Sequence, residues 1–416
     1  MRTTTLTACS LVVALSACGD ATSAASDWAG SVTDSAGVAM VTNPSSPSWS
    51  EAEAWGTEVV LRIGEAAGDA DYQFGQIAGI GVTSNGHILV LDQQAQRVQV
   101  YGPDGTYQSS IGRPGSGPGE FGPAASALFV GRGDTLIIPD VGNQRVNVTV
   151  IDGESTSFAI QMEQGIPMRY DLFESGDLVA QRRALNLPNQ DAVTNDLIAT
   201  QGYDGTILDT LLTPKRGDTF TFTSDRPQFH IFAPEPMWTT LSGNRLAFAT
   251  NDSYRIEVFS SDGSLERVVA NPYEPTPVTE SHERTLVDLM RTQFERNGVP
   301  PAQADLLMDG VSFADNWPAF TQMRAGPAGT LWVQRVRYLS DLTEEELESY
   351  NPTLDQGSPQ WDVFDSAGRY LGIVELPDRF TPFTVDGDRW YGVVRDDFDV
   401  QYVQVLRITG AAAGSS

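Results

Sequence analysis

The stretch that decides the fold is residues 80–121, which read IGVTSNGHILVLDQQAQRVQVYGPDGTYQSSIGRPGSGPGEF. It contains four apolar runs separated by turn residues. Asn85-Gly86 and Asp104-Gly105 supply the positive φ that tight hairpin turns require. The stretch therefore predicts a four-stranded antiparallel meander. A single sheet of this kind would leave two apolar faces in water.

The same pattern recurs along the rest of the chain. Glycines that open a second strand recur at Gly133, Gly176, Gly243, Gly329 and Gly387. The third strand recurs as RVNVTVI, LIATQGY, RIEVFS, QWDVFDS and YVQVLRI. Six copies of one small sheet predict an all-β protein, a six-bladed β-propeller in which neighbouring blades bury each other's faces.

The ends of the chain predict how this ring closes. The sixth unit stops near Ile408 without a fourth strand, whereas residues 58–63 form a solitary strand before the first unit. We expect residues 58–63 to pair with residues 402–408 and complete the last blade. This pairing would remove an open sheet edge that invites aggregation.

One insertion has a different period. Thr279 suits a helix N-cap, and Leu286 and Met290 belong to an apolar series at three- and four-residue spacing that ends at Gly298. A small helical insertion is therefore expected at residues 277–311, between blades four and five.

The N-terminus resembles an export signal. Residues 1–17 contain Arg2 and an apolar run too short to span a membrane, and the run ends in Leu-Ser-Ala-Cys at Cys18. This ending resembles a bacterial lipobox, which implies that Cys18 is lipidated. The alternative is an ordinary signal peptide in which Cys18 is incidental. Residues 18–54 are expected to form a tether and a hairpin, residues 55–409 the propeller, and residues 410–416 a disordered tail.

The charge limits the partners. The chain has 26 Lys+Arg against 54 Asp+Glu, a formal net charge of −28. A surface this acidic repels phosphate backbones, so nucleic acid is excluded as a partner.

Two segments carry a family resemblance. Residues 111–121 resemble the GxGxGxF-like joint of NHL repeats, and residues 140–146 resemble their DxxNxRV turn. The chain is therefore similar to bacterial six-bladed β-propeller lipoproteins with NHL-like repeats. The resemblance implies a location in the cell envelope, with the lipid membrane as partner of the anchor. The turn residues are expected to be structural, because they recur: Asp92 with Arg97, and Asp140 with Arg145.

Long connections are expected on one face of the ring. Links between strands one and two, or three and four, are tight turns, whereas the long segments join strands two and three or successive blades. These segments are 113–121, 181–195, 213–236, 271–319 and 340–359. Such one-sided elaboration predicts a binding face there. The alternative is that loop length accumulates wherever it does no harm.

The same connections gather cations and aromatic rings in an otherwise acidic protein. Arginine beside aromatic residues suits an anionic or sugar-like ligand, through bidentate hydrogen bonds and stacking. The candidate ligand-binding residues are Arg169, Arg182, Arg183, His230, Trp238, Trp317, Arg335 and Arg337. Arg169, Trp238 and Arg335 are expected nearest to the central channel.

These features favour a tethered binding propeller whose ligand is a protein, a peptide or a saccharide. The alternative is a propeller hydrolase or lyase, lactonase-like or NHL-lyase-like, with Ca²⁺ or a similar hard divalent ion on the axis. His87, His230 and His282 are the only histidines and are not expected to converge on one metal. No GxSxG or HExxH motif is present.

Overall fold

The computed structural model describes residues 28–151, 153–184, 193–223 and 226–410. The expected signal peptide, Cys18 and the tail beyond residue 410 lie outside these residues.

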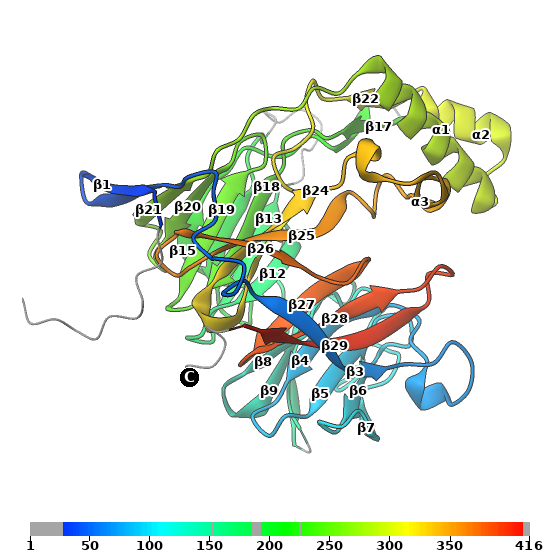
Figure 1. Ribbon diagram of the computed structural model, residues 1–416. Coiled ribbons are helices and arrows are strands. Elements are labelled where there is room, and N and C mark those ends of the chain that lie inside the picture. The colour runs from blue at the N-terminus through cyan, green and yellow to red at the C-terminus, as the bar shows by residue number, and fades with distance from the viewer. Residues whose placement is uncertain (1–27, 152, 185–192, 224–225, 411–416) are drawn as a thin grey trace, which may run out of the picture.

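Six antiparallel sheets form a ring, which confirms the predicted six-bladed β-propeller (Figure 1). Blade one is β4 (Ile77–Val82), β5 (Ile88–Asp92), β6 (Arg97–Tyr101) and β7 (Tyr107–Ile111). Blade two is β8 (Phe129–Gly131), β9 (Thr135–Asp140), β10 (Arg145–Val150) and β11 (Ser155–Ala159). Blade three is β12 (Ile166–Leu172), β13 (Leu178–Arg183), β14 (Leu197–Gln201) and β15 (Ile207–Leu212).

The remaining three blades follow the same order from the axis outward. Blade four contains β18 (Pro236–Leu241), β19 (Arg245–Thr250), β20 (Arg255–Phe259) and β21 (Leu265–Ala270). Blade five is β23 (Gln322–Ala325), β24 (Leu331–Val336), β25 (Gly357–Phe364) and β26 (Tyr370–Glu375). Blade six is β27 (Phe380–Asp386), β28 (Arg389–Arg395), β29 (Gln401–Thr409) and β3 (Gly56–Ile63).

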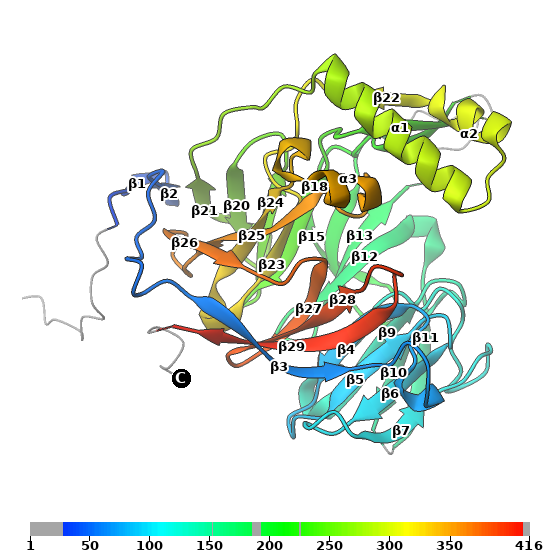
Figure 2. The same ribbon diagram turned by 45° about the vertical axis from the view of Figure 1, so that its right-hand side comes forward.

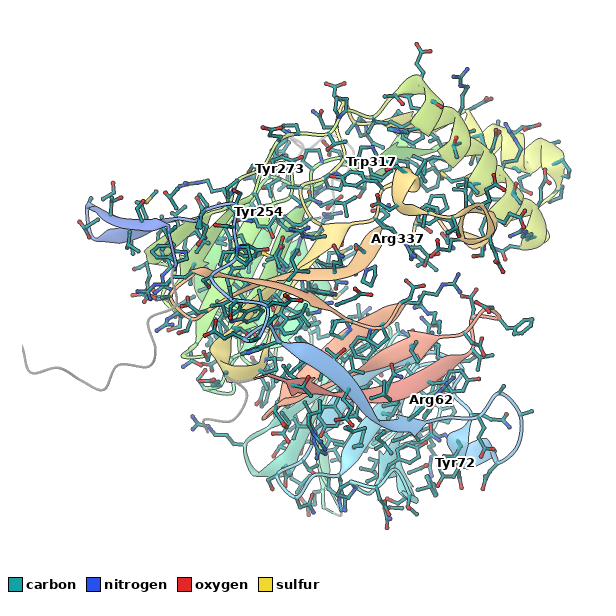
Figure 3. All side chains as sticks on the ribbon, in the orientation of Figure 1. Arg62, Tyr72, Tyr254, Tyr273, Trp317 and Arg337 are labelled. Carbon is teal, nitrogen blue, oxygen red and sulfur yellow. The ribbon has the colours of Figure 1, made fainter. Side chains whose placement is uncertain are left out.

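Blade six closes the ring as predicted. β3, from the N-terminus, pairs antiparallel with β29, from Val403 opposite Ile63 to Thr409 opposite Gly56. The guanidinium of Arg62 lies 3.8 Å from the centroid of the Tyr402 ring, which fastens the same strand pair (Figure 3).

The core consists of the spaces between blades. Side chains of a strand alternate between its two faces. Ile88 and Val90 of β5 therefore pack toward blade six, whereas Leu89 and Leu91 pack toward blade two. Because both faces of a blade are covered, every residue of β5 is buried.

Blade four is wider than the sequence predicts. β1 (Ser31–Ser35) and β2 (Val38–Thr42) form the expected hairpin, but β2 pairs in parallel with β21, so the hairpin extends this blade to six strands. Asn43 then reaches the next blade, donating from Nδ2 to the Gly368 carbonyl at 3.0 Å and accepting the Tyr370 N–H at 2.7 Å. The N-terminal segment thus crosses from blade four to blade five before it completes blade six.

The helices gather on one side of the ring (Figures 1 and 2). They are α1 (Glu280–Arg296), α2 (Pro301–Met308) and α3 (Glu344–Ser349), and Thr279 caps α1 as predicted. A small sheet of β16 (Phe220–Thr223), β17 (Arg226–Ile231) and β22 (Val311–Phe313) lies with them. No helix in the described part of the chain is long and apolar enough to cross a membrane.

The two faces of the ring differ in their connections. Turns from strand one to two and from three to four contain at most five residues, and we call their side the tight-turn face. The helices and the small sheet all belong to the opposite links, whose side we call the long-loop face.

Candidate ligand-binding channel

A cavity of about 530 Å³ runs along the axis of the ring. It is lined by β4, β8, β12, β18, β23 and β27, the innermost strand of each blade. Its lining includes Val82, Leu172 and Asp386, each of which is the last residue of an innermost strand. Because these strands end at the tight turns, the channel extends to the tight-turn face. In a propeller these innermost strands have one unpaired edge, which gives the channel wall free backbone groups.

Two arginines line the channel. Arg169 follows a bulge in β12, and its guanidinium lies 4.5 Å from the centroid of the Trp238 ring. Arg324, on β23, donates from Nη1 to the Met323 carbonyl at 3.1 Å and from Nε to the Pro382 carbonyl at 3.4 Å. Among the described residues, neither guanidinium forms an ion pair or a hydrogen bond with a carboxylate.

Arg169 and Arg324 are two enclosed cations with only one carboxylate, Asp171, acting on both. Burial lowers the pKa of Arg169, and burial followed by repulsion from Arg169 lowers the pKa of Arg324 to about 10. Asp171 is the carboxylate that acts on both, but its oxygens accept the N–H groups of Leu172 and Thr240. Both arginines, which are protonated at neutral pH, therefore share one nearby carboxylate and form no ion pair with it.

A buried hydrogen-bond chain holds the ring beneath Arg169. Trp238 Nε1 donates to Gln181 Oε1 at 2.8 Å, and Gln181 Nε2 donates to Asp196 Oδ2 at 2.8 Å. Arg183 Nη2 lies 2.8 Å from the same carboxylate, and Arg216 Nε lies 3.4 Å from its other oxygen. Although burial opposes ionisation, the hydrogen bonds from Arg183 and Gln181 keep the pKa of Asp196 below its usual range. Arg183 therefore supports the channel wall from behind.

Arg182 is a structural residue by its contacts. It is 1% exposed, and its guanidinium donates to Gln201 Oε1 at 2.8 Å, to the Gly165 carbonyl at 3.0 Å and to the Gln161 carbonyl. Arg182 and Arg183 are neighbours on a strand, so they point to opposite faces of blade three. They do not share a site.

Arg335 lies away from the channel. Its Nε donates to Asp362 Oδ1 at 3.0 Å, and Asp362 also accepts the hydroxyl groups of Tyr254 at 2.8 Å and Tyr370 at 3.0 Å. Asp362 is 2% exposed. This cluster joins blades four and five.

Trp317 belongs to the helical side of the molecule (Figure 3), and His230 lies on β17 of the small sheet there. Trp317 is buried, with its ring centroid 4.2 Å from that of Phe232 and 5.7 Å from that of His282. His230 and Trp317 both line a separate cavity of about 340 Å³ there. The structure thus brings Arg169, on the channel wall, together with the buried Trp238 ring, brings His230 together with Trp317 in the other cavity, and places the remaining candidates apart from these two pairs.

The repeated turn residues lie at the blade joints. Asp140 accepts the N–H of Gly122 at 2.9 Å and of Asn143 at 3.2 Å, and Arg145 donates to the Ser116 and Glu120 carbonyls at 2.7 Å each. In blade one, Asp92 accepts four backbone N–H groups, while Arg97 donates to the Ala70 carbonyl at 3.0 Å. These contacts tie each turn to the preceding joint.

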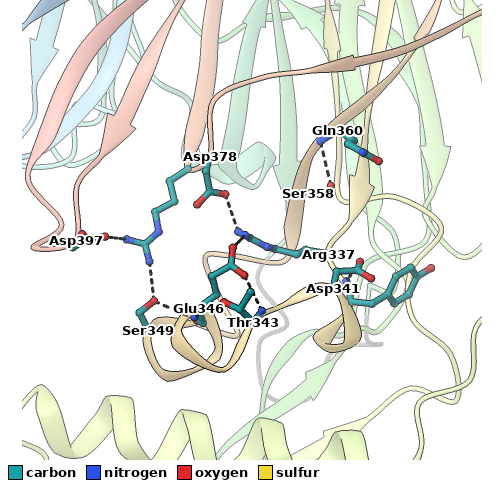
Figure 4. Close-up of polar contacts among 11 residues, drawn as sticks. Arg337, Asp341, Thr343, Glu346, Ser349, Ser358, Gln360, Asp378 and Asp397 are labelled. Carbon is teal, nitrogen blue, oxygen red and sulfur yellow. Dashed lines mark hydrogen bonds and ion pairs between the residues drawn. The ribbon is translucent and has the colours of Figure 1, made fainter.

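A second cavity, which we call the α3 cleft, lies on the long-loop face. It measures about 260 Å³ and is lined by residues of blades five and six, the segment around α3 and the end of α1. Arg337 binds Glu346 at 3.1 Å and Asp378 at 2.8 Å, whereas Arg379 contacts Asp397 at 3.5 Å and Ser349 at 3.3 Å (Figure 4). Burial raises the pKa of Asp355, which also lines the cleft and accepts the Asn351 N–H.

The part of the chain that the structure describes contains no cluster of metal-ligating side chains. Among these residues, no three His, Cys, Asp or Glu side chains lie together as a metal site.

Comparison with known proteins supports the fold. Residues 69–146, within blades one and two, match a family model described as a 6-bladed beta-propeller (DUF5128). No curated protein matches the chain. The structure is similar to that of a member of the duf4221 family from Bacteroides vulgatus, with TM-score 0.51 and 9% identity over 87% of this chain and 100% of that chain.

Two structures of known enzymes are more distant. A gluconolactonase from Xanthomonas campestris has TM-score 0.42 and 13% identity, covering 81% of this chain and 87% of its own. Virginiamycin B lyase from Staphylococcus aureus has TM-score 0.41 and 12% identity, covering 86% of this chain and 100% of its own. Similarity at this level says nothing about the activity of this chain.

Arg324 was missed by the sequence reasoning. It lies in QMRA, a four-residue strand without a motif, whereas the predicted candidates lie mostly in or beside long connections. The available signal is a charged residue inside the first strand of a blade, as Arg169 also is in blade three.

Proposed function

We propose that the protein is a binding propeller whose central channel holds a small anionic ligand through Arg169 and Arg324. The observation that carries the proposal is the presence of two enclosed guanidinium groups on the wall of one cavity, neither paired with a carboxylate. Enclosing a cation without a partner costs free energy, and a bound anion offsets that cost. Guanidinium groups also bind carboxylate, phosphate and sulfate with directional hydrogen bonds.

The ligand's contacts follow from the wall. One anionic group between the two guanidiniums would receive charge-assisted hydrogen bonds, and Thr240 and Thr384 also line the cavity. The guanidinium of Arg169 stacks on the Trp238 ring, so the guanidinium is positioned before the ligand binds.

An anion screen tests this function. We expect phosphate, sulfate, succinate or a sugar acid to raise the melting temperature of the purified domain in a saturable way, and chloride at equal ionic strength to leave it unchanged. Calcium and zinc chloride form the matched arm for an axial metal. Stabilisation by a divalent cation alone, with no anion effective, would contradict anion binding and favour the metal-dependent alternative.

We further propose that the domain is exported and held at a membrane through lipid on Cys18. The proposal rests on the lipobox-like end of the N-terminal apolar run and on the resemblance of the joints to NHL-like propeller lipoproteins. Chain geometry limits the ten residues from Cys18 to Trp28 to a reach of roughly 35 Å, so blade four, which carries the N-terminal hairpin, would lie nearest to the membrane.

Cys18→Ser should move the full-length protein from the membrane fraction to the released fraction of cells that process lipoproteins. Mass spectrometry of the mature N-terminus provides the direct measurement, and Cys9→Ser is the matched control. An unlipidated wild-type protein, cleaved near Ala17, would refute the anchor and leave the channel proposal untouched.

A further inference from the structure

The α3 cleft and the channel meet inside blades five and six. Thr381, on the innermost strand of blade six, lines both cavities. On the innermost strand of blade five, Gln322 lines the cleft and Arg324 lines the channel. These residues are two positions apart on one strand, so their side chains project from the same side, roughly 7 Å from each other. The cleft therefore adjoins the channel on its long-loop side, close to Arg324.

The wall of the cleft is close to neutral, because four arginines and four aspartates line it. Arg337 is held between Glu346 and Asp378, and Arg379 contacts Asp397. These contacts fix the α3 segment over the cleft and leave little net charge for a second anionic group.

Neutral polar groups remain for a ligand. Gln322 uses its Nε2 to bind Gln334 at 2.6 Å, which leaves its own carbonyl oxygen available. Asn351 uses its Oδ1 to accept from Thr353, which leaves its amide nitrogen available. Ser358 and Gln293 also line the cleft, whereas Leu354 is the large apolar side chain exposed there. Amide groups that both donate and accept suit hydroxyl groups better than the apolar side chains of a peptide.

From this arrangement we infer that the α3 cleft is a second subsite and the entrance of the channel, and that the ligand is an elongated sugar acid. Its acidic end binds between Arg324 and Arg169, and its neutral, hydroxyl-bearing sugar units extend past Thr381 into the cleft. The inference rests on the proposed anion-binding function and adds the ligand's class, length and direction.

A series of aldonates measures the second subsite. Gluconate, maltobionate and maltotrionate each carry one carboxylate and differ in the number of attached glucose units. In calorimetric titrations we expect the longest probe to bind about tenfold more tightly than gluconate, as a few added net hydrogen bonds would produce. N-acetylalanine and N-acetyl-trialanine form the peptide arm and should show no gain with length.

Two tryptophan substitutions identify the direction of entry. Leu354→Trp fills the cleft from a side chain that is 58% exposed and has no core contact to lose, so it should remove the gain with length and preserve gluconate binding. Asp386→Trp, at the exposed tight-turn mouth of the channel, is the matched control and should preserve the gain. Unchanged melting temperatures of both variants would show that folding is intact.

Each other outcome is decisive. If gluconate binds and length adds nothing, the second subsite is wrong and the anion channel stands. A gain lost in Asp386→Trp but kept in Leu354→Trp reverses the direction and overturns the inference, and a gain confined to the peptides overturns the ligand class. If no aldonate binds, the inference fails, and the phosphate and sulfate arms of the anion screen then decide separately whether the channel binds anions at all.

Discussion

Replacing Arg324 with methionine should weaken anion binding in the channel by about 10- to 100-fold, because a hydrogen bond to a charged group contributes about 1.5–3 kcal/mol. The unliganded variant should be as stable as the wild type or more stable. Arg324 is an enclosed cation without a carboxylate partner, and an apolar side chain of similar length avoids the cost of enclosing the charge. Calorimetric titration measures the binding, and urea denaturation without ligand measures the stability.

Weaker anion binding together with unchanged or higher stability distinguishes a ligand-binding residue from a structural one. A structural arginine would lower the stability of the unliganded protein when it is replaced, which Arg324→Met should not do. Arg284→Met, on the exposed surface of α1, is the control for loss of a charge. Anion affinity equal to that of the wild type in Arg324→Met would refute the assignment of this residue.

The pH dependence of the wild type gives the same test without a substitution. Burial and the neighbouring Arg169 lower the pKa of Arg324 to about 10. The cationic form binds the anion, and it is lost as the pH rises through the pKa. Affinity should therefore hold to about pH 9 and fall above about pH 10.

Replacing Asp362 with alanine should lower the free energy of unfolding by about 3–5 kcal/mol. The substitution leaves Arg335, Tyr254 and Tyr370 without the carboxylate that accepts their hydrogen bonds at 2.8–3.0 Å. Burial raises the pKa of both tyrosines, so they remain protonated donors and need an acceptor. Chemical denaturation followed by fluorescence measures the loss.

Two further variants complete this test. Asp388→Ala, whose carboxylate is 44% exposed and lies 3.9 Å from Arg389, should change stability by less than about 1 kcal/mol. Arg335→Met should be destabilising, because it leaves a buried carboxylate with one charged partner fewer. If Asp362→Ala costs no more than the Asp388 control, the cluster does not stabilise the joint between blades four and five.

The overall fold was predictable because its signals are local and repeated. Asn-Gly and Asp-Gly turns recur at fixed places in the blades, and a missing strand at one end matches a surplus strand at the other. The cap at Thr279 and the apolar spacing of α1 are also contained within one segment. Each of these features depends on residues close together in the chain or on counting copies of one unit.

Distant pairings that the repeated blade pattern does not specify were not predictable. The hairpin of β1 and β2 joins blade four through a parallel pair between residues 39–42 and 267–270, and nothing in its own sequence specifies that partner. β17 and β22 likewise pair across more than eighty residues of sequence. The same limit applies to the site. Arg335 lies on β24 and Arg337 lies directly after its end, with no motif to separate their roles, yet one binds a buried carboxylate and the other fixes the α3 segment.

The placement of residues 28–63 also sets the order in which the molecule can assemble. These residues leave the ribosome before all of their partners, and the partner of β3 comes last, with Gly56 opposite Thr409, while Asn43 binds the Gly368 carbonyl of blade five. β3 therefore stays unpaired until β29 has been synthesised. Until then, its unpaired backbone groups can form β-sheet hydrogen bonds with other chains. Co-translational folding can produce individual blades but not the closed ring, so a factor that shields this segment during synthesis or export would raise the yield of native protein.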